Sequence, residues 1–178
     1  MNSTKEWLLL TEQTQKNIFS ETAKAIGLPD AAVEKDWWVV RTLELVFQTA
    51  IGPHTVFKGG TSLSKAWNLI DRFSEDIDLV VLRGQGETDS KLKSKLKAVS
   101  TVVEAVFPEV PIEGITHKIG MNRKTAHSYN KEFKGDYGQV RDVIILESTW
   151  LGNYEPYTTK SIVSFVGQMM LDNKQSDI

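Results

Sequence analysis

The chain has 178 residues, of which 40% are hydrophobic and 25% are charged, with a formal net charge of -2 and no cysteine. This composition is typical of a soluble globular protein, and the absence of cysteine excludes disulfides, zinc–thiolate sites and a cysteine nucleophile. No apolar run approaches the ~20 residues of a membrane span, and the N-terminal stretch lacks a signal-peptide pattern, so we expect a cytoplasmic protein with no membrane partner. A nucleic-acid partner of such a chain needs a local basic patch.

The first part of the chain predicts two helices. Residues 4–26 form the first, which ends at Gly27, and Pro29 suits the first turn of the second. Apolar residues at spacings of three, four and seven extend this second helix to about Phe47. We expect these helices, within residues 1–50, to pack on a core formed by residues 51–178.

The core begins with alternating short strands and helices. A strand at 55–57 runs into two glycines, a helix follows at 62–69, and the apolar run at 77–82 is typical of a strand buried on both faces. A helix at 89–106 carries four lysines, at positions 91, 93, 95 and 97.

Three further strands are expected near 112–118, 125–133 and 140–148, and the tail at 161–170 favours a helix. The order of elements predicts an α/β (α+β) fold, in which a mixed sheet is flanked by helices.

Two carboxylates mark the start of the strand at 77–82. Asp76 and Asp78 are two residues apart, so on a strand they point to the same side. Buried together they repel each other, and a bound divalent cation removes that penalty. Their hard oxygen ligands suit magnesium better than zinc, and two such ions about 4 Å apart can clamp a triphosphate and activate an attacking hydroxyl.

A glycine turn precedes these carboxylates. Gly59 and Gly60 follow a strand, which lets the backbone approach a ligand closely, while Thr61 and Ser62 are suited to cap the next helix. The N-terminus of that helix is a natural phosphate site, which Lys65 can reach from one turn further on. Each pattern alone is common in ordinary turns and caps, but their combination at two strand ends favours a catalytic site.

The two segments FKGGTSLSKAW (residues 57–67) and RFSEDIDLV (72–80) resemble the glycine-turn and Asp-x-Asp signature of DNA polymerase β-type nucleotidyltransferases. More closely they resemble the AbiEii/AbiGii toxin family, as does EKDWWV at 34–39. The resemblance covers at least residues 33–82. It implies a polymerase β-type core that transfers a nucleoside monophosphate from a nucleoside triphosphate, with GTP a candidate, to an acceptor such as tRNA. It also implies two Mg²⁺ ions and, because the family consists of toxins of toxin–antitoxin and phage-defence systems, a cognate antitoxin.

The resemblance also assigns roles to single residues. Gly60 and Thr61 contact the triphosphate, while Asp76 and Asp78 hold metal. The superfamily uses a third carboxylate on a neighbouring strand, for which Glu147 fits best, at the end of an apolar run. Asp142 and Asp136 are the alternatives.

Several other residues leave alternatives open. Arg72 and Ser74 belong to the RFSED run, where contacts with phosphate or the carboxylates and a purely structural loop role are equally compatible. Lys58 is compatible with a role in the site and with a solvated position at the sheet edge. The four helix lysines are expected to form a solvated face, and RNA binding by them is the less favoured alternative. The remaining candidates are expected to serve packing or the surface: His54, His117, His127, Trp37 and Trp38.

The family resemblance raises one further expectation. Family members usually continue into a helical half, which this chain does not reach, so we expect a core truncated before that half, with exposed apolar surface around Phe165, Met169 and Met170. The alternative function is therefore a non-catalytic domain that binds a nucleotide or a partner.

Overall fold

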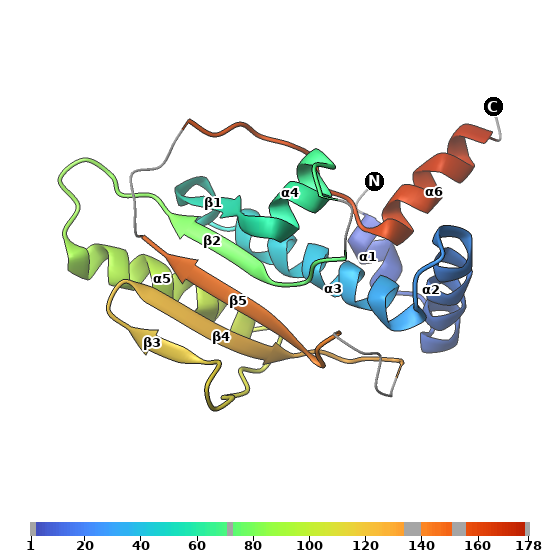
Figure 1. Cartoon of the computed structure of the whole chain (residues 1–178), viewed down its shortest axis with the longest axis horizontal. Coiled ribbons are helices and arrows are strands. Elements are labelled where there is room, and N and C mark those ends of the chain that lie inside the picture. The colour runs from blue at the N-terminus through green and yellow to red at the C-terminus, as the bar shows by residue number, and fades with distance from the viewer. Residues whose placement is uncertain (1–2, 71–72, 134–139, 151–155, 177–178) are drawn as a thin grey trace.

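The computed structural model describes residues 3–70, 73–133, 140–150 and 156–176. It contains helices and one sheet, in agreement with the predicted α/β class (Figure 1). The helices are α1 Ser3–Leu8, α2 Glu12–Ile26, α3 Asp30–Phe47, the 3₁₀ turn η1 Gly52–His54, α4 Gly59–Trp67, α5 Asp89–Glu104 and α6 Phe165–Ser176. The strands are β1 Thr55–Lys58, β2 Ile77–Val81, β3 His117–Ile119, β4 Asn122–Ser128 and β5 Val143–Thr149.

The five strands form a single mixed sheet in the order β1-β2-β5-β4-β3. β2 and β5 are parallel, and every other neighbouring pair is antiparallel. A parallel pair needs a long crossover, which here contains α5, β3 and β4. As a result β5, one of the last elements of the chain, lies in the middle of the sheet.

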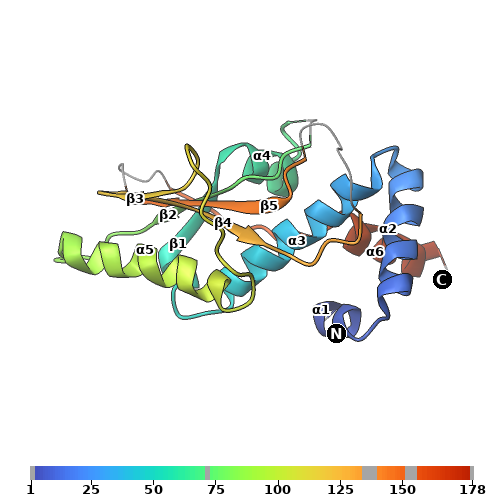
Figure 2. The same cartoon turned by 90° about the horizontal axis from the view of Figure 1, so that it is seen from below.

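The two faces of the sheet differ in what covers them. α3 and α5 lie on one face and α4 lies on the other, next to β1 and β2 (Figure 2). The covered face packs the alternate residues Ile77, Leu79 and Val81 against apolar side chains of α3 and α5. Asp78 and Val80, which point to the α4 side, are only half-buried. β2 therefore alternates between a fully buried and a half-buried face, rather than being buried on both faces as its apolar run predicted.

A second apolar cluster joins the N-terminal helices to α6. The Trp7 ring packs in a tilted arrangement against Phe19 and Trp37, at centroid distances of 4.9 and 5.2 Å, and Val166 of α6 is buried in the same cluster. Phe165 and Met170 pack partly against this cluster, and the Thr22 hydroxyl donates to the sulfur of Met169 at 3.4 Å. The apolar side chains of α6 are thus half covered by the N-terminal helices.

The predicted N-terminal helix at 4–26 is divided into α1 and α2. The break falls at Thr11, whose hydroxyl accepts a hydrogen bond from the backbone N–H of Thr14 at 3.2 Å and so caps α2. The strand predicted at 125–133 also shifts, to 122–128. In the part of the chain that the structure describes, no helix has the length and apolar character to cross a membrane.

Candidate active site

A row of charged or ionisable side chains crosses the α4 side of the sheet. Pairing places one residue of each strand in register, so their side chains share a face. In the order of the strands they are Lys58, Asp78, Glu147, Lys124 and His117, which we call the charged row. Its two acids are neighbours on the parallel strands β2 and β5, with a cation on each flank. This confirms the predicted position of Glu147 beside the Asp76–Asp78 segment, while the roles of these residues remain predictions.

The two acids of the row differ in their surroundings. Burial raises the pKa of Asp78, the negative charges of Glu147 and Asp76 raise it further, and Lys58 and Lys124 oppose the rise. No described residue donates a hydrogen bond to its carboxylate. Burial also disfavours the charge of Glu147, but its pKa is lowered overall, because Asn122 Nδ2 donates to it at 3.0 Å and Lys124 Nζ lies 3.1 Å away. Asp78 is therefore the acid whose negative charge is least compensated.

Asp76 lies one residue before β2 and adds a third carboxylate beside the charged row. Its carboxylate accepts a hydrogen bond from Arg141 Nη1 at 2.7 Å, and both side chains are close to half exposed. The negative charge of Asp76 raises the pKa of Asp78, which is consistent with their expected placement on one side of the chain. Nothing in the sequence patterns had pointed to Arg141.

The glycine turn packs directly against Asp78. Gly59 has φ +78°, and a Cβ at this position would lie 2.2 Å from Asp78 Oδ2. Both the left-handed backbone and the missing side chain are therefore needed for the turn to approach the carboxylate. Gly60 follows as the second residue of α4.

The hydroxyls that follow the glycines do not cap α4 as expected, because the helix starts at Gly59 rather than Ser62. The hydroxyls of Thr61 and Ser74 are hydrogen bonded to each other at 2.7 Å, and Ser62 Oγ donates to the carbonyl of Phe57 at 3.2 Å. Both α4 residues are buried, so these bonds tie α4 to β1 and to the segment that carries Asp76. Arg72 lies outside the described residues.

Lys65 takes a different position from the one predicted. Its ammonium forms a buried ion pair with Asp36 of α3 and lies 4.7 Å from the centre of the Phe165 ring. Contact with a phosphate at the charged row would require this buried pair to break, so we leave Lys65 out of the site.

Three consecutive charged residues of α3 are almost fully buried, which the sequence patterns had not indicated. Glu34, Lys35 and Asp36 have exposures of 1%, 0% and 3%. The Glu34 carboxylate accepts hydrogen bonds from the backbone N–H groups of Glu132 and Phe133, at 2.7 and 3.1 Å. Asp36, besides Lys65, accepts from the N–H of Phe165 at 2.8 Å.

Lys35 fixes the segments that lead into β2 and β5. Its ammonium donates to the carbonyls of Arg141 and Val143 and lies 3.6 Å from Glu75, whose carboxylate accepts from the N–H of Arg141. Burial lowers the pKa of Lys35 to about 8, although Glu75 opposes this. Through these contacts α3 sets where Asp76 and Arg141 lie.

The structure does not place the two alternatives for the third carboxylate in the charged row. Asp142 is 70% exposed and paired with Lys131, and Asp136 lies outside the described residues. Among the histidines, His127 is fully buried, and both of its ring nitrogens are hydrogen bonded within the core.

Helix α5, which carries the helix lysines, lies on the face of the sheet opposite α4 and the charged row (Figure 2). One of them, Lys95, is not solvated as expected but buried, where its ammonium contacts Glu87 at 2.6 Å and the carbonyl of Leu82 at 3.0 Å.

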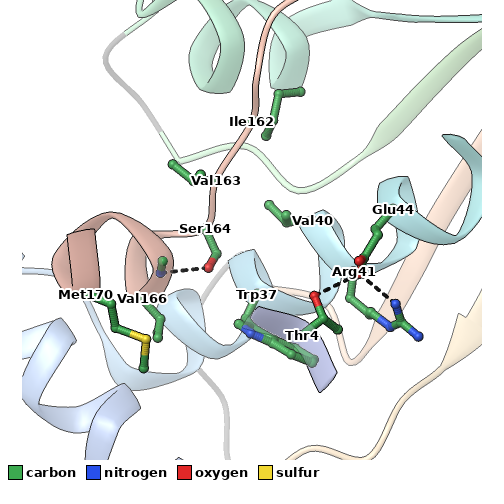
Figure 3. A pocket seen from close by; sticks show the side chains of 11 residues that line it. Thr4, Trp37, Val40, Arg41, Glu44, Ile162, Val163, Ser164, Val166 and Met170 are labelled. Atoms are coloured by element: carbon green, nitrogen blue, oxygen red, sulfur yellow. Dashed lines mark hydrogen bonds and ion pairs between the residues drawn. The ribbon is translucent and has the colours of Figure 1, made fainter. Parts of the chain in front are cut away.

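A hollow of about 230 Å³ lies between α1, α3 and the segment entering α6, and no residue of the charged row lines it. Its walls are mainly apolar, and its polar side chains contact each other: Glu44 accepts hydrogen bonds from Thr4 at 2.9 Å and from Arg41 at 2.6 Å (Figure 3). Because its charges are already balanced, this hollow offers no chemistry to the carboxylates.

The carboxylates supply hard oxygen donors of the kind that Mg²⁺ prefers. Within the described residues no three acidic or histidine side chains are gathered closely enough to hold a metal ion as they stand. Two of the three candidates are engaged by cations, Asp76 by Arg141 and Glu147 by Lys124. The donor set fits a divalent cation in its chemistry, provided that these two side chains give up their present partners.

A mixed sheet flanked by helices, with acids on adjacent parallel strands beside a glycine turn, is consistent with a nucleotidyltransferase-type fold. The family model for the AbiEii nucleotidyl transferase toxin of type IV toxin–antitoxin systems matches residues 44–175, and the chain belongs to this family. A search of curated proteins found no match.

Proposed function

We propose that this chain is a metal-dependent nucleotidyltransferase, which moves a nucleoside monophosphate from a nucleoside triphosphate to a hydroxyl of an acceptor. The observation that carries the proposal is the pairing of Asp78 with Glu147 on parallel strands, where Gly59 lies against Asp78. Two acids held side by side raise the cost of their charges. Such an arrangement is expected where a cation is to be bound rather than where stability alone is served.

In this proposal Asp76, Asp78 and Glu147 hold Mg²⁺, with two ions expected. When bound, the metal would neutralise the phosphate charge and lower the pKa of the attacking hydroxyl. The three carboxylates place this negative charge on the α4 side of the sheet, and the partial burial of Asp78 reduces its screening by water.

The triphosphate is expected at the start of α4. The first backbone N–H groups of a helix lack partners within the helix and favour anions. Gly59 and Gly60 leave this backbone free of side chains, and Lys58 adds a positive charge at the same end of the charged row. The bond between Thr61 and Ser74 keeps α4 in register with the Asp76 segment, which positions the reactants.

The acceptor is proposed to be RNA, such as tRNA, and the nucleotide GTP or another nucleoside triphosphate. The remaining expectations are a cognate antitoxin as partner and a location in the cytoplasm. A basic stretch supports the choice of a polyanionic acceptor: Lys124 and His117 continue the row from Glu147 to the edge strand β3. A phosphate backbone laid along this stretch would bring a terminal hydroxyl towards the acids.

The test is incubation of the protein with Mg²⁺, each labelled nucleoside triphosphate in turn, and total tRNA. Labelled RNA that is formed by the unaltered protein but not by Asp78→Ala supports the proposal. Nucleotide binding without transfer to any acceptor supports the alternative, a non-catalytic domain that binds a nucleotide or a partner. The present engagement of Asp76 and Glu147 by cations is the observation that keeps this alternative open.

A further inference from the structure

Arg141 is the cation that engages Asp76. Its Nη1 lies 2.7 Å from Asp76 Oδ1 and 3.5 Å from Glu75 Oε1, and its side chain is 48% exposed. Arg141 stands two residues before β5, the strand that carries Glu147. The guanidinium thus lies at the edge of the charged row, on the carboxylate that the proposed function assigns to metal.

The backbone of Arg141 is fixed independently of its side chain. Its N–H donates to both Glu75 oxygens, at 3.1 and 3.2 Å, and its carbonyl accepts from the buried ammonium of Lys35 at 2.7 Å. Only the guanidinium is left free to change partners. A substitution of the side chain therefore leaves the contacts that hold this segment in place.

The ion pair itself is suited to exchange. Ion pairs at half-exposed positions are weak, because water screens them and competes for both partners. The pair between Lys65 and Asp36 differs in that both side chains are buried, at 7% and 3% exposure, and separation would strand two charges without water. Of these two ion pairs, the buried Lys65–Asp36 pair is the one expected to persist, and the half-exposed Arg141–Asp76 pair is the one that can open.

We infer that Arg141 alternates between two anions. While no nucleotide is bound it forms an ion pair with Asp76, and once Asp76 binds a metal ion, Arg141 binds the triphosphate. This inference rests on the proposed function. A guanidinium and a metal ion on one carboxylate repel each other, so metal binding to Asp76 weakens its pair with Arg141. The planar fork of the guanidinium matches phosphate oxygens, and the fixed backbone keeps it within the site. Arg141 is accordingly a competitor of the metal and a ligand of the nucleotide.

This dual role predicts two opposite effects of one substitution. Arg141→Gln removes the competitor, so Mn²⁺ alone should bind several-fold more tightly, as measured by electron paramagnetic resonance of the free ion. In the presence of Mg²⁺, an α,β-methylene analogue of GTP, which cannot be cleaved, should bind roughly tenfold to a hundredfold more weakly in calorimetry. This range corresponds to the loss of one charge-assisted hydrogen bond. Arg141→Lys keeps the charge but not the fork, and should fall between the two proteins.

The matched control is Arg41→Gln. Arg41 is bonded to Glu44 at 2.6 Å in the hollow beside α1, which no residue of the charged row lines, so its loss removes an arginine–carboxylate pair outside the row. It should change neither affinity. A purely structural role of Arg141 would weaken both ligands together, and that result overturns the inference, as do unchanged affinities in Arg141→Gln. If the unaltered protein binds neither Mn²⁺ nor the analogue, the proposed function fails and the inference fails with it.

Discussion

The charges that α3 buries and the charges of the row on the sheet are balanced in opposite ways. Glu34, Lys35 and Asp36 are almost fully buried, and each has fixed partners of opposite charge or polarity. In the row, Asp78 and Glu147 are like charges in direct register, half open to solvent, with cations only at their flanks. The first arrangement serves the fold, because removal of any partner leaves an uncompensated buried group. The second leaves the charge of Asp78 poorly compensated, and is the one suited to bind a ligand.

The largest expected effect is on catalysis. Asp78→Ala and Asp76→Ala should abolish transfer, a loss on the order of a hundredfold or more, since even outer-shell partners of a metal are worth 10–100-fold. Both proteins should keep the native circular dichroism spectrum, because neither carboxylate supports the core. The matched control is Asp142→Ala, which removes an exposed acid outside the row and should transfer at the normal rate. Full transfer by either row variant contradicts the assignment of the metal ligands.

The second prediction concerns the stability of the fold and tests the buried ion pair between Asp36 and Lys65. Asp36→Ala leaves the Lys65 ammonium buried without its partner, and should lower the free energy of unfolding by about 3–5 kcal/mol in urea denaturation. The double variant Asp36→Leu with Lys65→Met removes both charges and should recover most of that loss. If Asp36→Ala unfolds at the same urea concentration as the unaltered protein, the buried pair is not what holds α3 to α4.

A third prediction separates two destabilising effects at the glycine turn: the cost of a left-handed backbone and the cost of a collision between the added Cβ and Asp78. Gly59→Ala should lower the free energy of unfolding by about 1–2 kcal/mol through its left-handed backbone, and further through collision with Asp78. Gly86 has a similar φ of +72° with no atom within 4 Å of the added Cβ, so Gly86→Ala reports the backbone cost alone. The difference between the two variants measures how closely the turn approaches the carboxylate. Equal losses would mean that Asp78 moves aside freely.

The smallest effect is a pair of opposite pH dependences within the row. The pKa of Asp78 is raised in the folded state, so the folded protein binds more protons than the unfolded chain between the ordinary and the raised value, and stability falls as pH rises through that interval. Without metal, Asp78→Asn should therefore be the more stable protein near pH 7, and its advantage should vanish on acidification towards about pH 4. The other charges that face Asp78 are Lys58, Asp76, Glu147 and Lys124.

Glu147→Gln supplies the opposite sign. The pKa of Glu147 is lowered in the folded state, so its charge contributes stability above its ordinary pKa that is lost as pH falls. Glu147→Gln should be less stable than the unaltered protein near pH 7, and the deficit should shrink with acid. Thermal melts of the two variants across this range check both signs, and parallel curves would show that the two acids share one environment.

The sequence predicted the parts of the site that local patterns encode. An apolar run that ends in Glu147 and the Asp-x-Asp step at β2 indicated strands with acids at defined positions, and pairing brought them together. The buried charges of α3 escaped prediction, because helical periodicity treats a charged residue as solvent-facing. The position of Arg141 at the site was not predicted, because the segment around it shows neither helical nor strand periodicity. Lys65 was misplaced because its partner, Asp36, is a tertiary contact that spacing along the chain does not reveal.

The central position of β5 has a consequence for how the protein comes into being. During synthesis β1, α4 and β2, which carry the glycine turn and Asp78, leave the ribosome well before β5. Glu147 follows only after α5, β3 and β4, and it meets Asp78 only when β5 inserts between β2 and β4. Long-range pairing of this kind forms late. A nascent chain that still lacks β5 therefore carries only half of the candidate site, and an activity that needs both acids can begin only after β5 has been made and has paired with β2.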